Sequence, residues 1–241
     1  MDDPKSLVAR GYDLVADAYW ERFGASEVRE RWLKLLIARL PERARVLDLG
    51  CGAGVPVARE LAAHNFEVIG VDGSPRQIEL AIGNVPAARF ILADMSSVAF
   101  ASSSFDAVSA FYSITHVPRD EHAALLGRIA DWLKPEGIFV GALGAQSLHD
   151  WRGEWLGAEM YFSHYDAKTN EGLIREAGLA IEKVEIVPQD NEDAKFMWVI
   201  ARRPPLGQEA AKVLIFVVAS EAKQSSRRCV RHPWIASLRS Q

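Results

Sequence analysis

The stretch RVLDLGCGAGVPVARELAAHNFEVIGVDGSPRQ, residues 45–77, decides the fold. It opens with a short apolar run that leads into a turn with glycines at positions 50, 52 and 54. Helical spacing follows over 55–64, and a second apolar run follows over 67–72. Glycine permits positive φ angles and lets another group approach the backbone closely. A strand that enters such a turn and leaves it as a helix is a nucleotide-binding arrangement.

Strand-like and helix-like patterns continue to alternate along the rest of the chain. We expect further strands over 88–94, 105–113, 137–144, 180–188 and 194–202, and helices over 74–84, 119–134 and 166–178. The last two strands should form a hairpin-like edge. This order predicts an α/β fold, a doubly wound Rossmann-like sheet of about seven mostly parallel strands with an antiparallel edge strand and helices on both faces.

Composition bounds the class of protein. The 241 residues are 49% hydrophobic and 25% charged, which is typical of a globular chain, and no apolar run approaches the ~18 residues of a membrane span. Only two cysteines occur, and the chain starts without an apolar leader, so we expect a cytoplasmic protein. Residues 1–203 carry a net charge of −8 and residues 204–241 one of +4. An acidic body would repel a phosphate backbone, so we expect no nucleic-acid partner.

Two details limit the classes of ligand that the glycine turn could bind. The spacing is G-x-G-x-G, and Val55 stands where a dinucleotide fingerprint has its third glycine. A nicotinamide-dependent oxidoreductase is therefore a disfavoured alternative. Asp72 ends the next strand, 18 positions after Gly54, where a carboxylate can accept hydrogen bonds from two ribose hydroxyls.

The ordered motifs resemble a known family. VLDLGCGAG, GVDGS and ILADM look like the first three motifs of class I S-adenosylmethionine-dependent methyltransferases, and FDAVSAFYSITHV, WLKPEGIFV and the early YDLVADAYW extend the pattern over roughly residues 10–203. The resemblance implies S-adenosyl-L-methionine as the cofactor. This cofactor has no phosphates, so a glycine at position 55 is not needed.

The resemblance also implies a role for each motif residue in cofactor binding. Asp48 would lie near the methionine end with the turn at 50–54, Asp72 would bind the ribose, and Asp94 would accept from the adenine amino group. Tyr12 and Tyr19 are seven apart, hence on one helix face, and would close over the cofactor. The full implied set is Tyr12, Tyr19, Asp48, Gly50, Gly52, Gly54, Asp72, Gly73, Ser74, Asp94, Met95, Phe111 and Tyr112.

Methyl transfer from a sulfonium is an in-line displacement, so alignment and exclusion of water are the main tasks of the protein. His116 follows the fourth strand, at the sheet edge that faces the ligand crevice, and it is the one catalytic candidate. It could remove a proton from the acceptor, contact the acceptor without taking its proton, or only shape the wall. We expect no bound metal.

Residues 145–165 interrupt the alternation with a segment rich in Trp, His and Tyr, which we interpret as an inserted cover. Its side chains could bind the acceptor or form a packing lid. The acceptor contacts predicted in and near this segment are Tyr112, His116, Trp151, Trp155, Met160, Tyr161 and His164. The reaction expected is transfer of a methyl group to an O, N or S atom of a small molecule. A cofactor-binding regulatory or partner subunit without catalysis is the alternative, and the oligomeric state stays open.

The composition changes at the double proline of Pro204 and Pro205, so we expect a methyltransferase domain over 1–203 and a tail over 204–241. The tail resembles translated copies of bacterial intergenic repeats, and we expect it to have no dedicated function. Contact of its basic, partly apolar sequence with an anionic membrane surface is the alternative.

Overall fold

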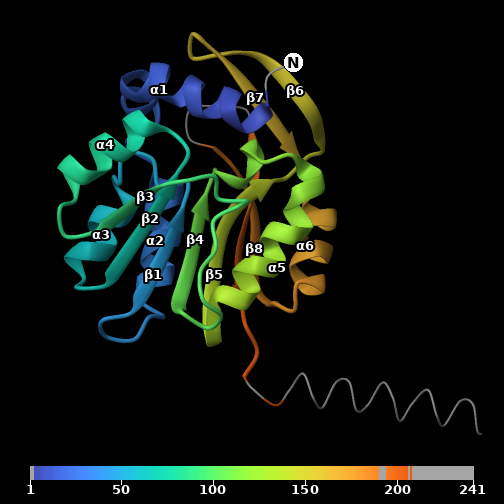
Figure 1. Ribbon diagram of the computed structural model, residues 1–241. Coiled ribbons are helices and arrows are strands. Elements are labelled where there is room, and N and C mark those ends of the chain that lie inside the picture. Colours follow the sequence, from blue (N-terminus) through green and yellow to red (C-terminus); the bar gives the residue numbers. More distant parts are fainter. Residues whose placement is uncertain (1–2, 190–193, 206, 208–241) are drawn as a thin grey trace, which may run out of the picture. The chain divides into compact units, whose positions relative to one another are not determined.

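The apolar runs of the sequence form one seven-stranded sheet, seen in the computed structural model of Figure 1, which describes residues 3–189, 194–205 and 207. The strand order is β3-β2-β1-β4-β5-β9-β8. Strands β1 to β5 pair in parallel, while β9 is antiparallel to both β5 and β8. The expected fold class is confirmed, with β8 as the edge strand of the antiparallel side. The bounds are β1 Arg45–Leu49, β2 Glu67–Asp72, β3 Arg89–Leu92, β4 Phe105–Phe111, β5 Leu133–Gly144, β8 Ala180–Pro188 and β9 Lys195–Arg202.

Both faces of the central strands β1, β4, β5 and β9 are buried, as is typical of the middle of a doubly wound sheet. Side chains alternate between two cores along each central strand, so that Leu47 and Leu49 of β1 face one core and Val46 faces the other. Helices α5 and α6 cover the first core, and α2 and α3 cover the second. The helices are α1 Pro4–Phe23, α2 Glu27–Ile37, α3 Val57–Ala63, α4 Pro75–Asn84, α5 His122–Trp132 and α6 Ala167–Glu176.

Two predicted boundaries shift in the structure. The helix predicted over 119–134 starts at His122, because residues 119–121 form a separate 3₁₀ turn, and it ends before Leu133, which already pairs with Phe105 of β4. The strand predicted over 88–94 ends at Leu92, so Asp94 lies in the following loop.

The aromatic segment 145–165 is a β-hairpin of β6 (Leu148–Trp155) and β7 (Ala158–His164). Its two-residue turn, Leu156–Gly157, has positive φ at both positions, as a type I′ hairpin turn requires. The hairpin packs on α1, and Figure 1 shows both elements beyond the same end of the main sheet. Val15 of α1 and Met160 of β7 are buried in this contact.

Among the described residues, no helix is long and apolar enough to cross a membrane. The contacts divide the chain into a unit over 1–204 and a unit over 205–241. The tail predicted from residue 204 falls almost entirely outside the described residues, so our expectation for its function stays a prediction.

One close contact joins the loops that follow the neighbouring strands β1 and β4. Gly50 has a φ angle of 71°, and a Cβ atom at this position would lie 2.2 Å from Cβ of Ser113. The Ser113 hydroxyl donates a hydrogen bond to the carbonyl of Leu49 at 2.7 Å. Glycine is therefore required at position 50 by the protein's own β4 loop, before any ligand is considered.

We predict that Gly50→Ala lowers the free energy of unfolding by at least about 2 kcal/mol, because it adds left-handed backbone strain to a steric overlap. Urea unfolding followed by circular dichroism would measure the change. Gly127→Ala is the control: Gly127 lies inside α5, nothing is within 4 Å of its added Cβ, and alanine should stabilise the helix by about 0.5–1 kcal/mol. Equal stability of Gly50→Ala and the wild type would contradict the proposed contact.

Candidate functional site

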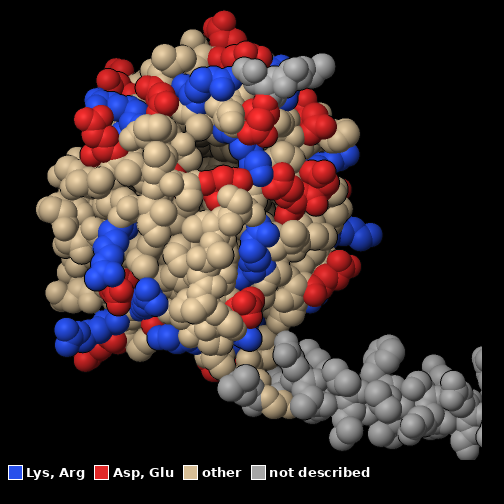
Figure 2. All heavy atoms as spheres, in the orientation of Figure 1, with Lys and Arg blue, Asp and Glu red and all other residues tan. Residues whose placement is uncertain are grey.

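A cavity of about 300 Å³ lies at the carboxyl ends of β1, β2, β3 and β4 and beneath α1. Figure 2 shows the hollow in this face of the molecule, with acidic and basic side chains on its rim. The cavity contains most of the predicted cofactor contacts and His116. The predicted residues that line it are Tyr12, Tyr19, Gly50, Gly52, Asp72, Gly73, Ser74, Asp94, Met95, Phe111, Tyr112 and His116.

The three glycines of the turn have three different environments. Gly50 is packed against Ser113, as described above. Gly52 has a φ angle of 52° and lines the cavity, and the nearest atom to an added Cβ is Oε1 of Gln77 at 3.6 Å. Gly54 does not line the cavity, because it faces Ala81 of α4 and neighbouring apolar side chains. Gly50 and Gly52 both line the cavity, but only at Gly52, among the three, would an added Cβ point into it without meeting the protein.

Asp72 is held by backbone donors on both sides. One carboxylate oxygen accepts from the amide of Gly52 at 2.9 Å, and the other accepts from the amide of Ser74 at 2.9 Å. Burial raises the pKa of Asp72, although these amide hydrogen bonds oppose the rise. Ser74 also caps α4 by accepting from the amide of Gln77 at 3.0 Å. The carboxylate therefore has a fixed position at the end of β2.

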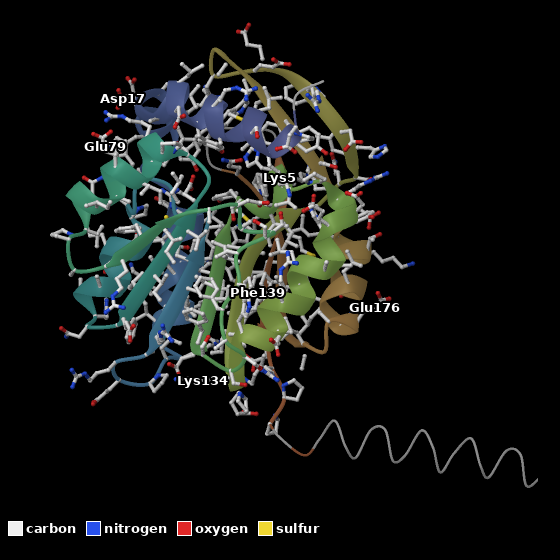
Figure 3. All side chains as sticks on the ribbon, in the orientation of Figure 1. Lys5, Asp17, Glu79, Lys134, Phe139 and Glu176 are labelled. Carbon is white, nitrogen blue, oxygen red and sulfur yellow. The ribbon has the colours of Figure 1, made fainter. Side chains whose placement is uncertain are left out.

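Asp94 lies at the other end of the cavity and forms an ion pair with Lys5 of α1 at 2.8 Å. Its second oxygen accepts from the amide and the hydroxyl of Ser96, each at 2.8 Å. Burial alone would raise the pKa of Asp94, but the hydrogen bonds from Lys5 and Ser96 outweigh it and lower the pKa. Lys5 also donates to Glu121 at 2.9 Å, so it connects α1 to two loops. Figure 3 shows Lys5 at the end of α1 near α5.

Lys5 was not among the residues predicted from the sequence, although its spacing from Tyr12 points to it. Positions 5, 12 and 19 are each seven apart and therefore lie on one face of a helix, and all three side chains line the cavity. Asp13 is a second residue that was not predicted to have a role at the site. One oxygen of its carboxylate accepts from the hydroxyl of Ser74 at 2.5 Å and from the amide of Arg76 at 3.0 Å, which ties α1 to the start of α4.

Asp48 is buried beneath the turn and does not line the cavity. The hydroxyl of Ser109 donates to one of its oxygens at 2.8 Å, and the other oxygen has no hydrogen-bond partner among the described residues. Burial raises the pKa of Asp48 to about 7, and the negative charge of Asp72 adds to the effect. Direct contact with a ligand in the cavity is thus not available to this carboxylate.

His116 is buried in the cavity wall, in a short 3₁₀ turn (Ile114–His116) after β4. Its Nδ1 lies 2.9 Å from the carbonyl oxygen of Tyr161, and its Nε2 lies 2.9 Å from the hydroxyl of Tyr12. Burial lowers the pKa of His116 to about 4, so the ring is neutral at physiological pH. The rings of Tyr12 and Tyr19 meet edge to face, with centroids 5.6 Å apart.

The hairpin residues predicted to bind the acceptor do not line this cavity. Met160 and Tyr161 are fully buried on β7, where Met160 packs on α1 and the hydroxyl of Tyr161 donates to Asp150 at 2.5 Å. Trp151 is partly exposed, and Nδ1 of His164 lies 2.7 Å from the carbonyl of Gln146.

Trp155 does not line the cavity, but its ring contacts two side chains that do. Its ring centroid lies 6.1 Å from those of Tyr12 and Tyr19. Its ring also stacks on Phe23 with centroids 5.9 Å apart. Helix α1 and the hairpin together form the roof of the cavity, and the described contacts give most of the hairpin a packing role in this roof.

Comparison with known proteins agrees with this geometry. A family model described as a methyltransferase domain matches residues 20–184. The chain belongs to the class I S-adenosylmethionine-dependent methyltransferases.

Curated relatives of this methyltransferase act on different acceptors. The 27-O-demethylrifamycin SV methyltransferase of Amycolatopsis mediterranei is 31% identical over 217 residues, which cover 76% of each chain. The trans-aconitate 2-methyltransferase of Variovorax paradoxus is 37% identical over 117 residues, and this match covers 46% of the present chain and 44% of that enzyme.

A solved structure shares the fold. The 1,6-didemethyltoxoflavin-N1-methyltransferase of Burkholderia thailandensis, determined with bound 1,6-didemethyltoxoflavin and S-adenosylhomocysteine, superposes with a TM-score of 0.64. It is 20% identical, and the match covers 81% of the present chain and 84% of that one. At this identity the likeness concerns the fold alone.

The residues of the methyltransferase cavity fit S-adenosylmethionine. The backbone at Gly52 is open to the cavity, a carboxylate stands at the end of β2, and Asp94 with Met95 lies beyond it. An alanine at position 52 would place a methyl group on the open, cavity-lining side of the turn. When bound, the cofactor supplies a methyl group already activated on a positively charged sulfur.

We predict that Asp48→Asn flattens the pH dependence of stability. The pKa of Asp48 is about 7 in the folded chain and about 3.9 when unfolded, so its contribution is fully present below pH ~4 and is lost as pH rises through about 7. The wild type should lose at most about 4 kcal/mol from this group between these limits. Denaturant unfolding from pH 4 to pH 8 would measure the loss. An unchanged slope in Asp48→Asn would show that Asp48 does not cause it.

Proposed function

We propose that this methyltransferase transfers the methyl group of S-adenosylmethionine to an oxygen, nitrogen or sulfur atom of a small uncharged acceptor. The charge distribution of the cavity carries this proposal. Lys5 is the only Lys or Arg in the described lining, and it is already bonded to Asp94 and Glu121. An acceptor carboxylate would therefore lack a cationic partner. The A. mediterranei relative, named for a demethylated oxygen position, supports a hydroxyl as the acceptor group.

We infer the cofactor contacts from position in the cavity. Asp72 would bind the ribose hydroxyls, with Gly73 and Ser74 beside it at the start of α4. Asp94 would accept from the adenine amino group, since it keeps acceptor capacity besides its bond to Lys5. Met95 would pack on the adenine ring.

The methionine part of the cofactor would lie over Gly50 and Gly52. Phe111 and Tyr112 would then line the site of the reactive methyl group, and Tyr19 would cover it from α1. Asp48 could act there only through a water molecule, because its carboxylate does not reach the cavity wall.

The acceptor would enter at the end of the cavity formed by Tyr12, Tyr112 and His116. The protein's work there is alignment of the acceptor with the sulfur–methyl bond and exclusion of water. Trp155 would influence acceptor choice indirectly, through its contacts with Tyr12 and Tyr19.

We predict that Asp72→Asn weakens S-adenosylmethionine binding by about 10- to 150-fold, the equivalent of one charge-assisted hydrogen bond of about 1.5–3 kcal/mol. Isothermal titration calorimetry would measure the dissociation constant. Asp17→Asn is the matched control, because Asp17 is exposed on the outer side of α1 and should leave the affinity unchanged (Figure 3). Gly52→Ala is an independent test, because it keeps both carboxylates and adds a methyl group to the open side of the turn.

Wild-type affinity in both Asp72→Asn and Gly52→Ala would remove this cavity as the cofactor site. The acceptor class is tested separately, by S-adenosylhomocysteine release with a panel of phenols, alcohols, amines, thiols and carboxylates. Turnover of carboxylates alone would contradict the uncharged acceptor.

A further inference from the structure

The hydrogen-bond partners of His116 determine which of its ring nitrogens carries the hydrogen. The carbonyl of Tyr161 can only accept, so Nδ1 of His116 carries the hydrogen and donates it. The neutral ring then has its lone pair on Nε2, which accepts from the Tyr12 hydroxyl at 2.9 Å. Both nitrogens are thus engaged with the protein. Tyr12 and His116 both line the cavity, and the Tyr12 hydroxyl occupies the second ring nitrogen, so a ligand there finds no free nitrogen on His116 but can contact Tyr12.

We propose that Tyr12 is a catalytic residue that takes the proton of a hydroxyl acceptor, a phenol or an alcohol, and passes its own proton to Nε2 of His116. The proposal rests on the proposed function, since it assumes methyl transfer in this cavity. A phenol oxygen accepts one hydrogen bond while it donates another, so Tyr12 can contact the acceptor and His116 together. His116 acts through Tyr12 and holds the proton.

The step balances in atoms and charge. The acceptor oxygen forms the new bond to the methyl carbon with a lone pair, and the sulfur retains the electron pair of the bond that breaks. The acceptor proton moves to the Tyr12 oxygen, and the former Tyr12 proton moves to Nε2. The products are the methylated acceptor, S-adenosylhomocysteine and protonated His116. One positive charge leaves sulfur as one appears on the imidazole, so the net charge of the cavity does not change.

Because the net charge of the cavity does not change, His116 can accept the proton of Tyr12 even though it is a weak base. Burial keeps His116 neutral before the reaction, and a nearby sulfonium would favour the neutral form further. Loss of the sulfonium during transfer then removes the repulsion that an imidazolium would meet. Among the described residues, the titratable groups that act on His116 are the Tyr12 phenol of α1 and His164 of β7. A positive charge on His164 also lowers the pKa of His116.

The test compares two acceptors in one variant. At about pH 8 unsubstituted phenol is largely protonated, whereas a nitrophenol of low pKa is largely ionised and needs no proton acceptor. The anion should bind less well in a site for uncharged acceptors, so each acceptor is compared with its own wild-type value. Tyr12→Phe should lower kcat/KM with phenol by about 100-fold or more and should lower kcat/KM with the nitrophenol far less. Tyr165→Phe, outside the cavity, should leave both values unchanged. An equal loss for both acceptors in Tyr12→Phe would show a packing role and overturn the relay.

A second measurement needs no turnover. Nitrogen-15 NMR of the full chain should show His116 neutral with its hydrogen on Nδ1 at pH 7, and Tyr12→Phe should shift the Nε2 resonance because its donor is lost. A hydrogen on Nε2, or a protonated ring at pH 7, would overturn the proposal. If only amines or thiols are methylated, the relay is wrong while the proposed function stands. If S-adenosylmethionine does not bind at all, the proposed function fails first.

Discussion

The approach of the β4 loop to the glycine turn fixes the floor of the cavity. The amide of Gly50 donates to the carbonyl of Val71 at 2.8 Å, and Ser113 packs where a side chain at position 50 would be. The loops that follow β1 and β4 are therefore joined to each other and to the end of β2. This is the place where successive strands extend the sheet in opposite directions, at which doubly wound folds bind ligands. The positions of Asp72 and Gly52 depend on this junction.

The roof depends on a different set of contacts. Helix α1 is attached to the sheet loops through Lys5, Tyr12 and Asp13, each bonded to a different loop. On its other side it shares an apolar contact with the hairpin, where a Cβ at Gly11 would lie 2.8 Å from Cε of Met160. The polar contacts of α1 fix its position over the cavity, and its apolar contact with the hairpin covers the side of α1 that faces away from the cavity.

Much of this arrangement follows from local sequence. Short apolar runs, glycines and an N-cap serine sufficed to predict a doubly wound, mostly parallel sheet with an antiparallel edge, and spacing by seven placed Tyr12 and Tyr19 on one helix face. The seven-stranded fold and its antiparallel edge are confirmed. The residue-by-residue roles in cofactor binding stay predictions.

Other residues could not be placed from the sequence, because their position depends on contacts between distant segments. Asp48 precedes the turn by only two residues, yet strand alternation directs it into the protein beside Ser109. Met160 and Tyr161 are aromatic or soft side chains suited to a ligand, and the hairpin uses them to bury α1 and to bond Asp150. The residue type shows which contacts a side chain can make, whereas the pairing of strands decides which face of the sheet or hairpin that side chain occupies.

Electrostatics links the floor, the roof and the proposed relay. The acidic side chains near the ends of β1, β2 and β3 are held in three ways: burial raises the pKa of Asp48 to about 7, Asp72 accepts from backbone amides, and Asp94 pairs with Lys5. The carboxylate of Asp72, held by neutral amides, leaves negative charge in the cavity wall that favours a sulfonium. In the relay, a proton on His116 appears as the sulfonium charge is lost. The cavity would then hold one positive charge before and after transfer, first on the sulfur and then on the imidazole.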